Sequence, residues 1–92
     1  SQAVIEFAPD GTIRTANQNF LSALGYTLDE IRGRHHRMFV DRDEAASDDY
    51  RRFWQRLAAG QSQVAEFRRV TKGGRDIWIQ ASYNPLFDMN GR

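Results

Sequence analysis

The side chains best suited to chemistry in this sequence are two adjacent histidines, His35 and His36. A neutral imidazole nitrogen can ligate a metal ion such as heme iron. The alternative is structural: His36 would be a partly buried histidine that donates to a backbone carbonyl, while His35 would face solvent. Both lie in residues 34–39, which have no clear helical or strand period and are expected to form a short turn.

Signatures of catalysis are missing from the sequence. It contains no cysteine, which excludes disulfides, cysteine-ligated zinc and thiol catalysis. No paired carboxylates share an apolar face, and no nucleophile stands beside a base. Gly73 and Gly74 join two extended runs instead of opening a helix, which argues against a phosphate-binding loop. We therefore expect a protein that is not an enzyme.

Composition narrows the class of partner. The chain has 92 residues, enough for one domain, and a net charge of +1 although 27% of its residues are charged. Nucleic-acid binding needs a clustered basic excess, which is absent, so we expect no nucleic-acid partner. No run is long enough to cross a membrane and no signal peptide is present. The expected location is the cytoplasm, without direct membrane insertion, and the lack of cysteine fits a reducing compartment.

The stretch 64–85 is the centre of the scaffold that must position the histidines. Two runs alternate with period two around a glycine-rich turn at 71–75, which predicts a long antiparallel hairpin. One face of this hairpin would carry Ala65, Phe67, Arg69, Ile77, Ile79, Ala81 and Tyr83. Trp78, Gln80 and Ser82 would face the other way. A two-stranded hairpin is marginal in water, so the preceding residues must cover its apolar face.

A second hairpin is predicted at the start of the chain. Residues 3–7 form a short apolar run, and residues 12–16 alternate around Ile13. Pro9, Asp10 and Gly11 between them are typical of a tight turn, since proline presets φ and glycine accepts a positive value.

Capping residues mark two short helices after this hairpin. Asn17 caps the first, which Gly25 ends. Thr27 and Glu30 form a capping box that opens the second, which should end at Gly33. Each has only one or two turns and needs packing on the sheet to be stable.

The longest helix is predicted at 48–59, after an acidic loop at 41–47. Ser47 caps it and Gly60 ends it. Its apolar stripe has helical spacing and consists of Tyr50, Phe53, Trp54 and Leu57. A hairpin at each end with helices between them predicts an α+β architecture, with the helices on one face of an antiparallel sheet.

In their order, the short motifs of the chain resemble PAS domains of bacterial chemotaxis transducers and aerotaxis-like receptors. The matching pieces are Asp10-Gly11-Thr12-Ile13, Ala16-Asn17, Asn19-Phe20, Leu24-Gly25-Tyr26, Leu28-Asp29-Glu30-Ile31-x-Gly33, His36-x-Met38-Phe39, Phe53-Trp54-x-x-Leu57-x-x-Gly60, Lys72-Gly73-Gly74, Trp78-Ile79, Ala81-Ser82-Tyr83-Asn84-Pro85 and Asp88-x-Asn90-Gly91. Each piece is weak alone, but the set covers essentially the whole chain. The chain is thus identified as a single PAS sensor domain, residues 1–92, of a methyl-accepting chemotaxis or aerotaxis-like transducer.

The resemblance implies the PAS fold: five antiparallel strands, short helices on one face and a small pocket between them. The fifth strand normally follows a turn like that at 88–91, and the sequence stops at Arg92. We therefore expect the last strand to be absent from this chain. In the family it is central in the sheet, so the strands that flank it would lack a partner and expose their edges.

Heme is the first cofactor that the resemblance suggests. Some aerotaxis-like PAS domains carry heme on a histidine of the turn between the second and third helices. His36 matches the family's His-x-Met with Met38, so it is the expected iron ligand if heme is bound, with His35 as second choice. The branch with its histidine on the long helix is not matched, because residues 48–59 contain none.

FAD is the second suggested cofactor. Trp54 matches the long-helix tryptophan of FAD-binding aerotaxis relatives, and Asn17 or Asn19 matches an early asparagine. However, Arg69 replaces a later asparagine and Asp41-Arg42-Asp43 replaces an Arg-His pair, which argues against flavin. The alternative role of Trp54 is helix-to-sheet packing. Without cysteine, the flavin–cysteinyl and thioester-chromophore branches are excluded, and a domain with no cofactor is as well supported as either.

The implied function is a sensory module that binds a small ligand or cofactor and relays the signal through sheet packing and dimerisation to an attached coiled-coil, chemotaxis-type output domain. Pocket residues would be Phe7, Phe20, His36, Met38, Trp54, Phe67, Arg69, Ile79, Ala81 and Tyr83. A homodimer or second PAS copy would contact the outer sheet face at Trp78, Gln80 and Ser82. The alternative is a ligand-free dimerisation or docking module.

Overall fold

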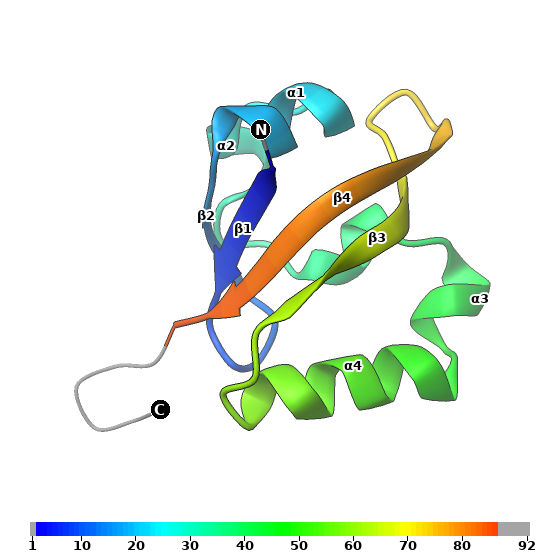
Figure 1. The fold of residues 1–92 in the computed structure, drawn as a ribbon. Coiled ribbons are helices and arrows are strands. Elements are labelled where there is room, and N and C mark those ends of the chain that lie inside the picture. The colour runs from blue at the N-terminus through cyan, green and yellow to red at the C-terminus, as the bar shows by residue number, and fades with distance from the viewer. Residues whose placement is uncertain (1, 87–92) are drawn as a thin grey trace.

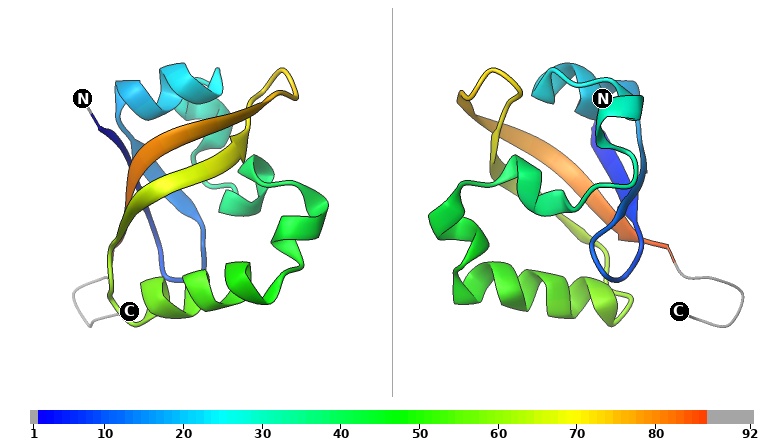
Figure 2. Two further views of the ribbon diagram at one scale, coloured as in Figure 1. Left: turned by 45° about the vertical axis from the view of Figure 1, so that its right-hand side comes forward. Right: turned by 180° about the vertical axis from the view of Figure 1, so that it is seen from behind.

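Four strands form one twisted sheet in the order β2–β1–β4–β3 in the computed structural model, which describes residues 2–86 (Figure 1). The strands are β1 (Ala3–Phe7), β2 (Ile13–Ala16), β3 (Gln63–Val70) and β4 (Asp76–Pro85). The helices are α1 (Gln18–Leu24), α2 (Leu28–Ile31), the 3-10 helix η1 (His36–Phe39), α3 (Arg42–Ala45) and α4 (Asp48–Ala58). Seen from behind, the helices lie in front of the sheet, which confirms the α+β prediction (Figure 2). The expected turn at 88–91 lies outside the described residues.

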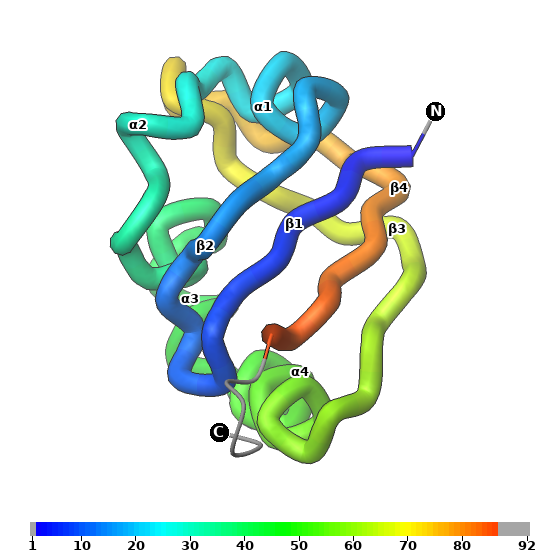
Figure 3. The backbone as a smooth tube through the Cα atoms, turned by 90° about the vertical axis from the view of Figure 1, so that its left-hand side faces the viewer, coloured from blue at the N-terminus to red at the C-terminus, as the bar shows by residue number. Residues whose placement is uncertain are grey.

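The predicted hairpins are present, but the sheet is mixed and not wholly antiparallel. β1 pairs antiparallel with β2, and β3 with β4, where Phe67 lies opposite Ile79. β1 and β4 lie side by side in parallel, with Ile5 opposite Tyr83 (Figure 3). This corrects the expectation that strands next to an absent fifth strand would lack partners. Direct pairing satisfies backbone groups that would be costly to leave unpaired, and it buries Ile5 and Tyr83 on one face.

Local signals place the helix boundaries close to their predicted positions. Asn17 caps α1, and Gly25 follows it with a left-handed φ of 81°. Both hydrogen bonds of the Thr27–Glu30 capping box are formed, although α2 ends at Ile31, slightly before Gly33. Ser47 caps α4 through the backbone N–H of its third residue. Side-chain caps therefore specify helix starts even where the helix is a single turn.

Two segments are more regular than predicted. Residues 41–47, expected to be a loop, contain the one-turn helix α3. In this helix the backbone N–H of Glu44 donates to the side chain of Asp41 at 2.7 Å. The Asp-x-x-Glu spacing is that of a helix cap, and it was hidden by the polar character of the segment. The expected turn at 34–39 is the 3-10 helix η1, capped by His35, whose Nδ1 accepts from Arg37 N at 3.0 Å.

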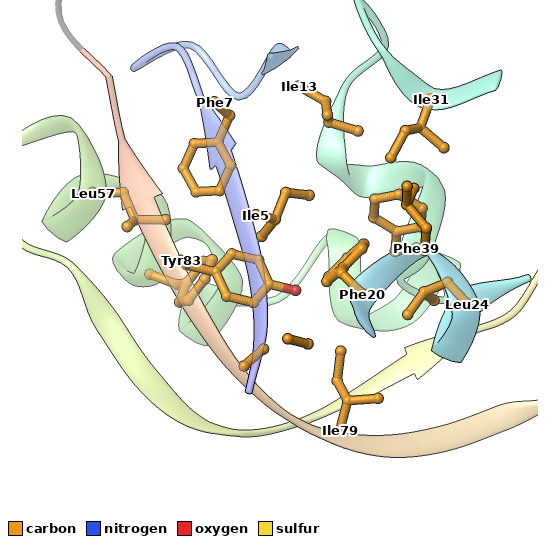
Figure 4. Close-up of a cluster of buried hydrophobic side chains, with 14 residues drawn as sticks. Ile5, Phe7, Ile13, Phe20, Leu24, Ile31, Phe39, Leu57, Ile79 and Tyr83 are labelled. Carbon is orange, nitrogen blue, oxygen red and sulfur yellow. The ribbon is translucent and has the colours of Figure 1, made fainter. Parts of the chain in front are cut away.

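The core lies between the helices and the inner face of the sheet. Its fully buried side chains include Ile5, Phe7, Phe20, Leu57 and Tyr83. Figure 4 shows Tyr83 and Ile5 projecting from neighbouring strands into the middle of this cluster. A tyrosine at the centre of an apolar core brings a hydroxyl that must find a partner, so it sets the position of polar groups around it.

Substitution of Asn17 by alanine should lower the free energy of unfolding by about 1–2 kcal/mol. Its Oδ1 accepts from Phe20 N and from Val4 N, both at 3.0 Å, so one side chain caps α1 and ties it to β1. Urea unfolding at neutral pH measures the loss. The control is Gln18→Ala, whose exposed side chain donates to Ser22 one turn further along the same helix, and which should change stability by less than about 0.5 kcal/mol. Equal losses in both variants would contradict the capping role.

Candidate functional site

His36 is the centre of a buried polar chain. It belongs to η1, and its side chain is fully buried. Nδ1 lies 3.0 Å from the Tyr50 hydroxyl of α4, and Nε2 lies 2.9 Å from the Tyr83 hydroxyl of β4. One imidazole therefore joins the helical layer to the sheet.

Arg69 continues this chain toward the surface. Its Nε donates to the Tyr83 hydroxyl at 2.8 Å, and its Nη1 donates to Glu44 of α3 at 3.0 Å. The residue is only 2% exposed. We call the connected side chains Tyr50, His36, Tyr83, Arg69 and Glu44 the polar chain. It runs from α4 through the core to α3.

The donor and acceptor roles along the polar chain follow from Arg69. A guanidinium only donates, so the Tyr83 oxygen must accept from it. Tyr83 is completely buried, and its own proton finds a partner only at Nε2 of His36. This assigns the imidazole proton to Nδ1, which donates to Tyr50. The polar chain thus has one direction, from Arg69 to Tyr50.

Electrostatics keep the middle of the polar chain uncharged. Burial, and then the positive charge of Arg69, hold the pKa of His36 well below its usual value of 6.5. Burial raises the pKa of Tyr83 to about 12. Burial also raises the pKa of Tyr50. The three groups are neutral at physiological pH and act as hydrogen-bonding groups.

A groove of about 770 Å³ opens where the polar chain reaches the surface. It lies between α3, α4 and the edge strand β3. Its lining combines aromatic and charged side chains: Tyr50, Phe53, Phe67, Arg56, Arg68, Arg69, Asp41, Asp43, Glu44 and Asp49, with Ser47, Gln63 and Ala65. Both ends of the polar chain are in this list, so a molecule in the groove would contact groups bonded directly to the core.

Comparison with known proteins agrees with this fold. A family model described as the PAS fold matches residues 1–92. The chain belongs to the PAS family. It is 50% identical over its full length to the biofilm dispersion protein BdlA of Pseudomonas aeruginosa, and 30% identical over 94% of its length to the oxygen sensor protein DosP of Escherichia coli. It spans 22% and 11% of those proteins.

Solved structures give the same result for the fold. A light-oxygen-voltage domain studied with a flavin analogue superimposes on this PAS domain with a TM-score of 0.66 and 28% sequence identity, over 91% of this chain and 62% of that one.

Within residues 2–86, no helix has both the length and the apolar character needed to span a membrane.

The PAS domain brings together about half of the predicted site residues. The Tyr83 ring lies 5.0 Å from the imidazole of His36 and 4.8 Å from the Phe67 ring, measured between centroids. The Arg69 guanidinium lies 4.8 Å from the Phe67 ring centroid, and Trp54 lies 5.5 Å from His36. These five residues form one cluster, and two of them, Phe67 and Arg69, line the groove.

The other predicted site residues lie outside this cluster, although the Phe20 ring centroid is 6.5 Å from that of Tyr83. Phe20 and Ile79 belong to the hydrophobic core, and Met38 packs against it. His35 is half-buried and not in solvent as expected; it lies against the turn, where a side chain at Gly11 would collide with its ring. His36 is wholly and not partly buried, and its partners are hydroxyls instead of a backbone carbonyl. The alternation along the strands predicted which side chains are buried. The hydrogen-bond partners of His36, however, depend on the tertiary fold.

Heme does not fit the residues as they are arranged. Both nitrogens of His36 are engaged by tyrosine hydroxyls, and the imidazole is fully buried. His36 is not part of the groove lining. An iron ligand needs a free nitrogen lone pair facing an open space. Among the described residues, no group of three or more histidine or acidic side chains is placed to bind a metal ion.

Flavin fits no better. Trp54 packs edge-on against Phe7, with ring centroids 4.8 Å apart, and Phe7 lies 5.8 Å from Tyr83. These contacts fill the space that a flat isoalloxazine ring would need. The Trp54 indole N–H is buried and makes no hydrogen bond within residues 2–86, so this side chain contributes packing, as its alternative interpretation proposed.

Two members of the polar chain were not predicted as site residues. Tyr50 was assigned to the apolar stripe of the long helix, and Glu44 to a loop. A tyrosine on a buried stripe always brings a hydroxyl that needs a partner, so Tyr50 could have been matched with a buried histidine. The signal for Glu44 was the helix-capping spacing that begins at Asp41.

The outer face of the sheet has the predicted orientation. Trp78 is 70% exposed and Val64 is 60% exposed. Gln80 is exposed and Ser82 is half-buried. Large exposed apolar side chains on a sheet face are a common feature of contact surfaces.

Proposed function

We propose that this chain is a sensory PAS module that binds a small ligand in the groove and relays its presence to an attached chemotaxis-type signalling domain. The observation that carries the proposal is the course of the polar chain. Tyr50 and Arg69 line the groove, while His36 and Tyr83, between them, are fully buried. A ligand that moved either end would break a hydrogen bond in the core.

The sheet offers a route for the relay. Tyr83 accepts from Arg69 and lies opposite Ile5 of β1, at the junction of the two hairpins. Trp78, on the same strand β4, points to the outer face. A ligand that shifts Tyr83 would therefore change the packing of β4 and the surface that carries Trp78, biasing one of two arrangements of the sheet.

The wider setting of the module is also part of the proposal. The names of its relatives, an oxygen sensor and a biofilm dispersion protein, support a role in signalling. We place the module in the cytoplasm as a non-catalytic sensor. Its partners would be a second copy, contacting Trp78, Gln80 and Ser82, and a coiled-coil output domain.

Ligand mapping by NMR tests this function. The ¹⁵N-labelled chain is mixed with pools of neutral, anionic and cationic small molecules, and amide shifts are recorded. We expect perturbations at Phe67, Arg69 and Tyr50. Ala65 is exposed, lines the groove and shares a strand face with Phe67, so Ala65→Phe should obstruct the groove and abolish the perturbations. Val64→Phe, on the opposite face of the same strand, is the matched control and should leave them intact.

A ligand-free dimerisation module is the second candidate. It is favoured by the filled core around His36 and by the exposure of Trp78. It predicts no groove perturbation with any pool, together with a dimer in sedimentation experiments that Trp78→Gln dissociates. That combination of results would exclude the sensory proposal.

A further inference from the structure

Arg69 presents an unused donor edge to the groove. Its Nε is bonded to Tyr83, and its Nη1 donates to Arg68 O at 2.7 Å and to Glu44 Oε2 at 3.0 Å. Within residues 2–86, Nη2 has no hydrogen-bond partner, and Arg69 lines the groove. A guanidinium has five N–H groups, so Nη2 of Arg69 can still donate to an acceptor in the groove.

Aromatic rings fix the plane of this guanidinium. Its central carbon lies 4.8 Å from the Phe67 ring centroid, 5.3 Å from that of Tyr83 and 6.0 Å from that of Phe53. Arginine stacked on aromatic faces is held in one orientation, and its exposed edge matches the two oxygens of a carboxylate. The same rings offer an apolar wall to the body of a ligand.

One carboxylate oxygen of Glu44 accepts a hydrogen bond from Nη1 of Arg69, and a second arginine, Arg68, lies close to the other oxygen. The Glu44 side chain is 29% exposed and belongs to the one-turn helix α3. Its other oxygen, Oε1, lies 3.9 Å from Nη2 of Arg68. Arg68 itself is bonded to Asp41 at 2.5 Å. The Glu44 carboxylate is thus hydrogen-bonded to Arg69 and within ion-pair distance of Arg68, at the same Nη2 that contacts Asp41.

We propose that the groove selects a small carboxylate with an aromatic or apolar body, whose carboxylate takes the place of Glu44 on Arg69 while Glu44 moves to Arg68. This inference rests on the function proposed above and names its ligand class. The carboxylate pairs with both terminal nitrogens of Arg69, and the body packs against Phe67 and Phe53.

The charges around the groove limit the head group to a single negative charge. Four acids (Asp41, Asp43, Glu44 and Asp49) and three arginines (Arg56, Arg68 and Arg69) line it, a balance of −1. Because the balance is negative, the acids would repel a phosphate ester or a tricarboxylate more strongly than a single carboxylate. A monocarboxylate satisfies Arg69 and adds little further repulsion.

Three probes with the same ring and different head groups test the inference: phenylacetate, phenylacetamide and phenethylamine. They are titrated by NMR against the full chain, following the amides of Phe67 and Arg69. We expect phenylacetate to bind at least tenfold more tightly than the neutral and cationic probes. In Glu44→Gln the internal competitor has lost its charge, and phenylacetate should bind about tenfold more tightly than to the wild type. Arg32→Gln removes a charge that lies outside the groove, where Arg32 is paired with Asp29, and should change the affinity less than twofold.

Several results would overturn the carboxylate inference. Equal affinity for the three probes would do so, as would an unchanged phenylacetate affinity in Glu44→Gln, or no groove perturbation by phenylacetate in either protein. These outcomes leave the sensory proposal standing as long as some pool in the mapping experiment perturbs the groove and Ala65→Phe abolishes it. Arg69→Gln should abolish phenylacetate binding, but the Glu44→Gln comparison decides the question even if loss of Arg69 unfolds the domain.

Discussion

His36→Leu is expected to lower the free energy of unfolding at pH 7.5 by about 3 kcal/mol. Leucine is close in volume to histidine, so the loss comes from hydrogen bonding and not from a cavity. The Tyr83 hydroxyl would lose the acceptor for its proton, and Tyr50 would lose its partner at 3.0 Å. Each buried hydroxyl left unpaired costs about 1–3 kcal/mol. Urea or thermal unfolding followed by circular dichroism measures the effect.

A double-mutant cycle separates hydrogen bonding from packing in this result. Tyr50→Phe removes one of the two hydroxyls that His36 binds. If these two groups depend on each other, His36→Leu combined with Tyr50→Phe will be more stable than the sum of the single losses predicts, by about 1–2 kcal/mol. Strictly additive losses would show that the hydrogen bond between His36 and Tyr50 does not contribute to stability.

The parts of this fold that could be predicted from the sequence are those determined by residues close together along the chain. Asn17, Thr27 and Ser47 each hydrogen-bond a backbone N–H three residues further on. The alternation in β4 likewise placed Ile79 and Tyr83 in the core and Trp78 on the outer face. A cap or a strand period needs only a short window of sequence, so it can be recognised without the fold.

The polar chain could not be predicted in this way, because its partners are distant in sequence. His36 bonds Tyr50 across 14 positions and Tyr83 across 47 positions. Arg69 reaches Glu44 across 25 positions. The parallel pairing of β1 with β4 has the same origin, since it depends on how the two hairpins meet and not on either one.

The histidine that looked most like a metal ligand is therefore better described as a structural group. A ligand would need a free nitrogen, whereas both nitrogens of His36 are used to hold two hydroxyls from different layers of the domain. Under the proposed function, the same bonds would carry a change at the groove to His36, because Tyr50 and Arg69 both line it. Stability and response would then depend on one set of hydrogen bonds.

Acid should destabilise the domain at a pH where most carboxylates are still ionised. The pKa of His36 is well below 6.5 in the folded state, because burial and Arg69 disfavour its charged form. In the unfolded chain its pKa is about 6.5. Above that pH the histidine is neutral in both states and stability does not depend on it. Below it the unfolded state binds the additional proton, so the free energy of unfolding falls as pH falls.

The slope of the free energy of unfolding that His36 contributes has an upper limit of about 1.4 kcal/mol per pH unit, the value for one proton. The pKa of His35 is also lowered, by burial and then Arg37, so it adds a loss in the same direction. Asp10 and Glu30 act at lower pH: their pKa values are lowered by hydrogen bonds to Thr12 and Lys72, so their contributions are lost only as pH falls below about 4.5.

Urea unfolding of the wild type, His36→Leu and His35→Gln between pH 8 and pH 5 tests this assignment. The wild type and His35→Gln should both lose stability steeply below pH 6.5, whereas His36→Leu should show a much flatter curve. The difference in free energy of unfolding between wild type and His36→Leu, about 3 kcal/mol at pH 7.5, should then narrow as the pH falls toward 5. Parallel curves for these two proteins would mean that His36 takes up its proton equally in the folded and unfolded states, which a fully buried imidazole between two neutral hydroxyls and beside a guanidinium cannot do.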